Sequence, residues 1–290
     1  IRARAVWSDV NYPLFYGYVE SWPMTWVNGV DARVNVGLVD GFKVFAVKRL
    51  NVNYAAEKSD VRIGNVLDDV FWTLGAAWVL DSATNSQLDT TTILGPVGDR
   101  LLMQGQTTIQ ATILVDAVAI QHLQDVALAE NGLLFMGGDG AVVFYDRHYK
   151  YRPEYAVSKG TFGDAVGELH YSDLELAYDD ADIWNEIRMG RVGGVVQTVS
   201  DSTGSQLNYW PRTLAQEDLL ADSDFEMADR ANWMLARYKN PTPRITAIAF
   251  EGADVALWPQ LLGREVGDRI TVRRRPQGGT LIEGDYHIEA

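Results

Sequence analysis

Cysteine is absent from this 290-residue chain. Its absence excludes disulfide scaffolds, zinc sites built on thiolates and cysteine nucleophiles. It leaves the redox compartment open, because a chain without cysteine is compatible with any compartment. Histidine is scarce, with four residues, and no two of them have the spacing of metal ligands. We therefore expect no metal site and no cofactor, and structural or surface roles for His122, His148, His170 and His287.

Positive charge is also in short supply. The chain has 25 Lys and Arg against 39 Asp and Glu, a formal net charge of -14. This balance argues against a firm grip on nucleic acid, which needs basic patches facing the phosphates. It argues equally against an anionic membrane surface, although DNA could still pass close to the protein without binding.

Long apolar runs are missing as well. No run approaches the roughly 18 residues that a membrane-spanning helix needs. The chain opens at Ile1 in the strand-like sequence IRARAVW, which does not resemble a signal peptide. We expect the chain to begin inside a longer polypeptide, and its length allows one large domain or two.

Catalytic motifs are lacking too: there is no GxSxG elbow, no P-loop and no GxGxxG. The glycines of 137–140 lie between two apolar runs, which favours a hairpin turn over a phosphate-binding loop. The acidic run 178–182 is compatible with a hard cation, but its spacing matches no calcium loop, which favours a solvated turn. Paired carboxylates for glycoside hydrolysis stay open, since such partners need not be close in sequence.

The residue patterns that are present predict a β-rich α+β fold rather than a doubly wound one. Residues 14–50 have the turns and alternation of an antiparallel meander. Apolar spacing predicts helices over 59–74 and 116–130, followed by a hairpin of 133–136 with 141–145. Residues 147–170 are expected to be loop, and the chain is expected to return to strands from 171. The capping-box pair Ser223 and Glu226 starts a predicted helix over 223–238. The last strands surround a short apolar turn, LWPQLLG.

Aromatic residues are abundant, above all in YPLFYGYVESWPMTW at 12–26. The nine tryptophans are spread over the chain, and three interpretations stay open: core packing, subunit contact and a sugar-binding face. The basic cluster 273–275 has two interpretations. It is either an edge strand protected by charge or a contact with an acidic neighbouring subunit.

Six segments together resemble the hub-type minor tail proteins of long-tailed phages that infect actinobacteria. They occur in the family's order between Tyr12 and Val272. The segments are YPLFYGYVESWPMTW, RIGNVLDDV, NGLLFMGGDGAVVFYDR, AYDDADIWNEIRMGR, ARYKNPTPRIT and LWPQLLGREVGDRITV.

The resemblance implies two β-barrel-like tail-tube domains with an inserted α/β region. Residues 1–50 would be part of the first tube domain, whose N-terminal part would be missing. Residues 51–173 would be the insertion, and 174–290 the second tube domain with the helix at about 223–238. Three copies would form a ring that continues the tail tube, closes or adapts its distal end and lets DNA pass.

The family offers no catalytic residues to carry over, so the resemblance implies a structural protein and not an enzyme. It would be made in the host cytoplasm and located at the virion tail tip. Its expected partners are other copies of itself, the distal tail ring protein, the end of the tape-measure protein and other tail-tip proteins, without specific nucleic-acid binding. The alternatives are a hexameric distal tail ring protein, a tail-associated cell-wall hydrolase and a host glycan-binding module.

Two sets of residues are predicted to matter for such a ring. Rigid aromatics and charged strand residues would contact the neighbouring subunit. Acidic residues would face the lumen or the rim between subunits, where they would not hold phosphates. The interface candidates are Tyr16, Tyr18, Trp22, Trp26, Arg273 and Arg275. The acidic candidates are Asp31, Asp40, Asp173, Glu175, Asp179, Asp180 and Asp182.

Overall fold

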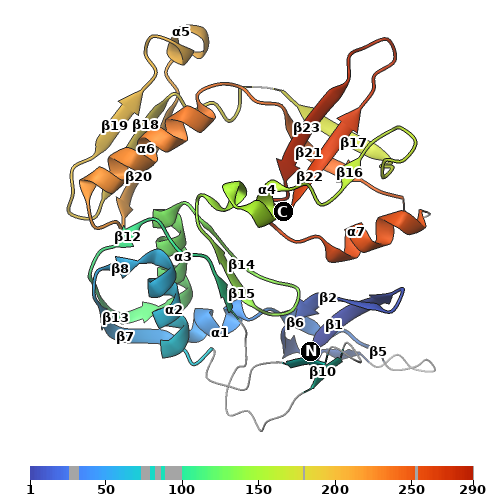
Figure 1. Ribbon diagram of the computed structural model, residues 1–290. Helices are drawn as coiled ribbons and strands as arrows, with labels where there is room; N and C mark the ends of the chain where they lie inside the picture. The colour runs from blue at the N-terminus through green and yellow to red at the C-terminus, as the bar shows by residue number, and fades with distance from the viewer. Residues whose placement is uncertain are drawn as a thin grey trace.

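The computed structural model describes residues 1–25, 33–72, 79–81, 86–88, 100–178, 180–251 and 254–289. The predicted mixture of strands and helices without a doubly wound sheet is confirmed (Figure 1). The strands form small sheets of two or three, and none of those in the described ranges closes into a barrel. The described residues thus show no closed barrel in either of the expected barrel-like domains. The predicted domain boundaries after residues 50 and 173 stay predictions.

The N-terminal strands are short and paired antiparallel. β1 (Arg2–Trp7) forms a hairpin with β2 (Val10–Tyr16) through Ser8 and Asp9, whose φ angles of 49° and 61° are those of a two-residue hairpin turn. β3 (Tyr18–Ser21) pairs with β6 (Gly37–Val39), and β4 (Met24–Thr25) pairs with β5 (Arg33–Val34).

The predicted meander does not continue to residue 50. Helix α1 (Phe42–Val47) interrupts it, because the side chain of Asp40 accepts a hydrogen bond from Phe42 N at 3.0 Å and Phe45 is buried. The next strand, β7 (Arg49–Tyr54), pairs with β13 (Thr112–Val118) instead of with the N-terminal strands.

Helices α2 (Ser59–Asp69) and α3 (Ala119–Glu130) confirm two predicted helices with shorter bounds. α2 ends early because Phe71 adopts a φ of 61°, and Leu74 lies outside the described residues. α3 starts late because 116–118 belong to β13, which contains an irregularity between Leu114 and Ala117. The predicted stop is confirmed: Asn131 is left-handed and caps α3. The largest buried cluster forms here, with Phe45, Leu50, Ile63, Leu67, Trp72, Leu123, Val126 and Phe144 among its members.

The predicted hairpin is confirmed as β14 (Leu133–Met136) and β15 (Val142–Tyr145). Its turn needs glycine at Gly140, where φ is 92° and the ring of Tyr16 lies against the backbone. β11 (Arg100–Leu102) adds to β15 in parallel. Two further pairs are β8 (Glu57–Lys58) with β12 (Thr108–Ile109), and β9 (Val79–Asp81) with β10 (Ser86–Leu88).

The segment expected to be loop is partly helical, with η1 (Tyr149–Tyr151) and α4 (Pro153–Ala156). Residues 186–219 form a sheet in the order β19 (Gln197–Ser200), β18 (Glu186–Arg191), β20 (Thr213–Leu219). Helix α5 (Ser205–Tyr209) lies between β19 and β20 in the sequence. Helix α6 (Asp224–Tyr238) confirms the helix predicted over 223–238. Its N-cap is Ser223, whose Oγ accepts a hydrogen bond from Glu226 N at 3.2 Å. Its buried stripe covers the sheet and consists of Met227, Arg230, Ala231 and Met234.

The C-terminal strands form a three-stranded and a two-stranded sheet around one apolar cluster. The first has the order β16 (Thr161–Phe162), β22 (Arg269–Arg274), β23 (Ile282–His287), and the second pairs β17 (Asp173–Ala177) with β21 (Arg244–Ala249). The expected turn LWPQLLG is helical: η2 (Val255–Leu257) continues into α7 (Trp258–Gly263), which has proline in its first turn. None of the helices in the described ranges is long and apolar enough to cross a membrane.

Helix α7, in the C-terminal part of the chain, packs against the N-terminal hairpin. It lies beside β1 and β2 (Figure 1), where the rings of Trp7 and Trp258 are 5.7 Å apart. Just after it, Glu265 Oε1 accepts a hydrogen bond from Gly138 N in the β14–β15 turn at 3.2 Å. The N-terminal hairpin, the central hairpin and the C-terminal block therefore meet at one place.

Candidate functional site

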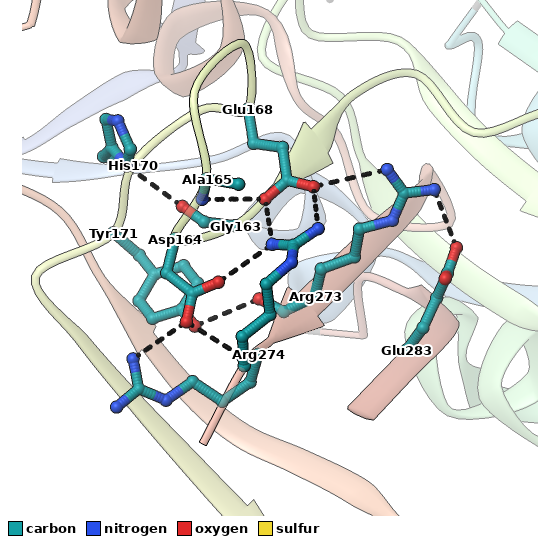
Figure 2. A network of polar contacts seen from close by, with 10 residues as sticks. Gly163, Asp164, Ala165, Glu168, His170, Tyr171, Arg273, Arg274 and Glu283 are labelled. Carbon is teal, nitrogen blue, oxygen red and sulfur yellow. Dashed lines mark hydrogen bonds and ion pairs between the residues drawn. The ribbon is translucent and has the colours of Figure 1, made fainter. Parts of the chain in front are cut away.

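An arginine–carboxylate network occupies the end of β22 (Figure 2). Arg273 and Arg274 are the last two residues of β22, and Arg275 follows them. Their side chains pair with Asp164 and Glu168 in the loop 163–168, which follows β16. Because β16 pairs with β22 at Thr161 and Phe162, the loop that follows it is held next to the three arginines.

Glu168 is the centre of the network. Its two carboxylate oxygens accept hydrogen bonds from the two terminal nitrogens of Arg275, at 2.7 Å each, which is the bidentate geometry. Arg273 Nη1 donates to Oε1 at 3.3 Å, and Ala165 N donates to Oε2 at 3.1 Å. Arg273 also donates through Nη2 to Glu283 Oε1 on β23 at 2.8 Å, so the loop, β22 and β23 are tied together.

Asp164 binds the adjacent part of the same arginine run. Its Oδ2 accepts from Arg275 N at 2.9 Å and from Arg274 Nη1 at 3.2 Å, while its Oδ1 accepts from Arg275 Nη1 at 2.9 Å. The hydrogen bond from the backbone N–H of Arg275 lowers the pKa of this carboxyl, with the charged groups of Arg275 and Arg274 acting in the same direction. Asp164 thus stays ionised around neutral pH.

The same cause acts more strongly on Glu168. Hydrogen bonds from Arg275 lower the pKa of Glu168 from 4.5 to about 2, and those from Ala165 and Arg273 add to the effect. In return, Glu283 and Glu168 raise the pKa of Arg273. A carboxylate held ionised in this way does not donate a proton near neutral pH, so the network acts as a clamp between strands rather than as an acid–base pair.

This geometry bears on both interpretations of 273–275. β22 lies between β16 and β23, but its pairing with β16 ends at Val272, so Arg273 and Arg274 pair with β23 alone. Its arginines pair with carboxylates of the same chain, so the charges of Arg273 and Arg275 are already balanced before any neighbouring subunit arrives. Their role at a subunit interface stays a prediction.

Replacing Glu168 with glutamine should lower the melting temperature at pH 7, because the charged acceptor of Arg275 is lost. The pKa of Glu168 is lower in the folded than in the unfolded protein, so its stabilisation is complete above pH 4.5 and declines as the pH falls towards 2. The difference between wild type and variant, followed by calorimetry from pH 7 to pH 2.5, should therefore shrink. A difference that grows on acidification would contradict this assignment, and the exposed Glu154→Gln is the control.

The aromatic interface candidates divide into two kinds. Tyr16 and Tyr18 are half-buried, with ring centroids 6.3 Å apart, and Arg2 lies over the Tyr16 ring at 5.1 Å. Burial raises the pKa of Tyr18 to about 12. Trp22 is 62% exposed, the most exposed of the three members of this set that the structure describes. Trp26 lies outside the described residues.

The acidic candidates have several different environments. Asp40 caps α1, whereas Asp180 and Asp182 are exposed and pair with Arg212 and Arg244. Two candidates, Asp173 and Glu175, are exposed on β17. Asp31 and Asp179 lie outside the described residues. Within the described ranges no group of three or more His, Asp or Glu side chains is arranged to hold a metal ion. Whether the acidic residues face a lumen stays a prediction.

No protein-family model matches the chain, and no curated protein matches it. Its fold is similar to that of the tail protein from Neisseria meningitidis MC58, with a TM-score of 0.58 and 13% identity over 99% of this chain and 76% of that one. It is also similar to the 43 kDa tail protein of prophage MuSo2 from Shewanella oneidensis. There the TM-score is 0.54 with 13% identity, over 93% of this chain and 73% of that one.

The chain has the fold of a phage tail protein.

A second polar centre in this tail-protein fold was missed from the sequence. Glu130, at the end of α3, is fully buried, and its Oε2 accepts hydrogen bonds from Ser59 Oγ, Gln106 N and Thr107 N at 2.9, 3.0 and 2.7 Å. Its Oε1 lies 4.0 Å from Nε of the buried Arg147. The available signal was its spacing, four residues after Val126 and seven after Leu123, which places an acid on the buried face of a helix.

The buried Arg230 of α6 extends this centre. It donates to Ala129 O at 3.0 Å and to the side chain of Gln216. Burial and the nearby Arg147 lower the pKa of Arg230 to about 10, while Glu130 opposes the shift. These groups join α3 to α6, and Thr108 N adds a hydrogen bond to Glu226 Oε1 at 2.9 Å. The centre therefore fixes the β18–β20 sheet and its helix onto the main core.

Proposed function

We propose that this chain is a structural subunit of the tail tip of a long-tailed phage of actinobacteria, a hub protein that forms a ring continuing the tail tube. The observation that carries the proposal is the fold similarity to a tail protein over 99% of the chain. The host group and the hub role rest on the six sequence segments between residues 12 and 272. The proposed ring has three copies, closes or adapts the distal end of the tube and lets DNA pass.

The surface of the N-terminal strands supports a self-contact. Five large apolar side chains are exposed between residues 6 and 24. They are Val6, Val10, Leu14, Trp22 and Met24. Tryptophan is favoured at the energetic centre of protein interfaces. We assign this surface to contact with a neighbouring copy.

The net charge of -14 agrees with a conduit that does not hold DNA. In this proposal the protein is located at the virion tail tip and has a structural, non-enzymatic role. Its axial partners are the distal tail ring protein, the end of the tape-measure protein and other tail-tip proteins. The arginine–carboxylate clamp would keep the β22–β23 hairpin rigid within the ring.

Negative-stain electron microscopy of the purified chain at high concentration, with symmetry classification, tests the proposal. Open rings with three-fold symmetry are the expected result. Six-fold rings would instead indicate a distal tail ring protein, because one tube-like unit per chain needs six copies to close the same ring.

The variant Trp22→Glu should lose the rings, because it places a charge in the proposed contact. Phe225→Glu is the matched control, since Phe225 is an exposed aromatic residue on α6, away from the N-terminal strands. Rings that persist in Trp22→Glu would contradict the assigned surface, and monomers at every concentration would contradict self-assembly of the chain.

A further inference from the structure

A cavity of about 420 Å³ lies where the N-terminal hairpin, the central hairpin and the end of α7 meet. Figure 1 shows the β14–β15 hairpin reaching β2, with α7 nearby. The volume falls within the roughly 300–1,000 Å³ of pockets that hold a ligand. Three parts of the chain that are far apart in sequence therefore enclose a space large enough for a bound group.

One face of the sheet β11–β15–β14 forms an apolar floor of the cavity. Leu101 on β11 and Phe135 on β14 are both in register with Val143 on β15, so the three side chains lie in one row across the sheet. Tyr12 of β2 and Leu262 of α7 add apolar surface from the other two segments. Leu101 is 49% exposed, so the floor is open to a group from another molecule.

Close approaches between the backbones hold the walls of the cavity in place. A Cβ at Gly138 would lie 2.6 Å from Pro13 O and 3.1 Å from Glu265 Oε1, so this position in the hairpin turn needs glycine. A Cβ at Gly263, at the end of α7, would lie 3.2 Å from a ring carbon of Tyr12. The site is therefore built before a ligand arrives, which reduces the entropy lost on binding.

Two carboxylates line the same cavity, that of Asp139 in the hairpin turn and that of Glu265 after α7. Partial burial raises the pKa of Glu265 and the charge of Asp139 adds to the shift, whereas the hydrogen bond from Gly138 N opposes it. Among the residues that the structure describes, no lysine or arginine forms an ion pair with either carboxylate. Two neighbouring like charges beside an apolar floor favour the binding of a cation.

The nearby arginines are engaged with other carboxylates. Arg100, which also lines the cavity, donates from Nη1 to Asp68 Oδ1 on α2 at 3.0 Å. Arg264 precedes Glu265 in the sequence, and its Nη1 lies 3.2 Å from Asp268 Oδ2. The negative charge of the cavity is therefore not balanced by the basic side chains closest to it.

We propose that this cavity binds a lysine or arginine side chain of a partner protein. Such a side chain has an aliphatic stem that covers apolar surface and a cationic head that hydrogen-bonds to carboxylates. The stem fits the row of Leu101, Phe135 and Val143, and the head fits Asp139 and Glu265. The open floor favours a side chain carried by another protein, because pockets for small molecules bury about 70–90% of the ligand surface. The inference goes beyond the proposed ring and does not depend on it.

The test titrates the whole chain, labelled with nitrogen-15, with the peptide acetyl-Leu-Lys-Leu-amide near neutral pH and follows the backbone amides by NMR. The amides of Gly138 and Ala141 donate to Glu265 and Asp139, so their signals report on the two carboxylates. We expect both signals to shift with the peptide. The same peptide with norleucine in place of lysine keeps the stem without the charge and should bind about tenfold more weakly.

Substitutions that remove one charge test each carboxylate. Glu265→Gln and Asp139→Asn keep an oxygen that accepts from Gly138 N and Ala141 N. Each should weaken binding of the lysine peptide about tenfold and leave binding of the norleucine peptide unchanged. Glu154→Gln, which removes an exposed carboxylate of α4, is the matched control and should bind both peptides as the wild type does.

Three results would overturn the inference. The signals of Gly138 and Ala141 do not shift, the two peptides bind equally well, or Glu154→Gln loses as much affinity as Glu265→Gln. A titration with n-pentylammonium distinguishes the source of the cation. If it binds as tightly as the lysine peptide, the cavity is a site for a free amine and the partner-protein assignment is wrong.

Discussion

Replacing Glu130 with alanine is expected to lower the free energy of unfolding by about 3–5 kcal/mol, as for other buried ion pairs that lose one partner. The substitution removes the buried acceptor of Ser59, Gln106 and Thr107, and it leaves Arg147 with Asp229, at 3.8 Å, as its remaining ion-pair partner. Urea denaturation followed by circular dichroism measures the loss.

Hydrogen exchange distinguishes this mechanism from general destabilisation. The amides of Gln106 and Thr107 donate to Glu130, so the substitution should speed up their exchange. Their exchange rates should rise more than those of the amides in β22. Glu154→Ala, at an exposed position of α4, should change stability by less than about 0.5 kcal/mol. A loss below 1 kcal/mol in Glu130→Ala would contradict the role of Glu130 in holding Ser59, Gln106 and Thr107 against the end of α3.

Replacing Trp72 with alanine should cost about 3–5 kcal/mol, because a fully buried ring is removed and a cavity remains. Trp72 is in the largest apolar cluster, with its ring 4.9 Å from that of Phe45, and Gly41 leaves the space that its edge occupies. The shift in the urea midpoint, with the slope held fixed, gives the loss.

Trp22→Ala is the matched control, since it removes the same side chain from an exposed position. Its free energy of unfolding should stay within about 0.5 kcal/mol of the wild type. Equal losses in the two variants would contradict the placement of Trp72 in the core. The pair also separates two of the roles considered for the tryptophans, core packing and surface contact.

Local signals in the sequence predicted the elements whose ends are set by neighbouring residues. The helix over 223–238 was recognisable because Ser223 caps it through the N–H of Glu226. The hairpin around 137–140 was recognisable because its glycines lie between two apolar runs, and Gly140 adopts a positive φ. Helix α1 was missed because its six residues are stabilised by the burial of Phe45 and the cap from Asp40, which a strand pattern hides.

Long-range pairing could not be predicted in the same way. The runs at 173–177 and 186–191 are close in sequence, with the acidic run 178–182 between them, yet β17 pairs with β21 and β18 pairs with β19 and β20. Alternation of residues shows which face is buried, not which strand lies alongside. The segment LWPQLLG, expected to be a turn, forms η2 and α7, and α7 lies against β1 and β2, a contact with the far end of the chain that the local sequence does not show.

The candidate site was likewise predictable in its local part and not in its long-range contacts. The arginines at 273–275 stood out as the basic cluster of an acidic chain, but their partners Asp164 and Glu168 are more than 100 residues away in sequence. Nothing near 164–168 marks these two among 39 acidic residues. Glu130 was recognisable in principle from its position on the apolar stripe of α3.

The contact between α7 and the β1–β2 hairpin has a consequence for synthesis on the ribosome. Trp7 leaves the exit tunnel long before its partner Trp258 is made, on the order of ten seconds earlier at roughly 5–20 residues per second. During that interval the ring of Trp7 has no α7 against it, and the hairpin also carries the exposed Val6, Val10 and Leu14. The nascent chain therefore carries an apolar hairpin without its partner helix until α7 is made, and chaperones that bind emerging apolar segments can bind it during that interval.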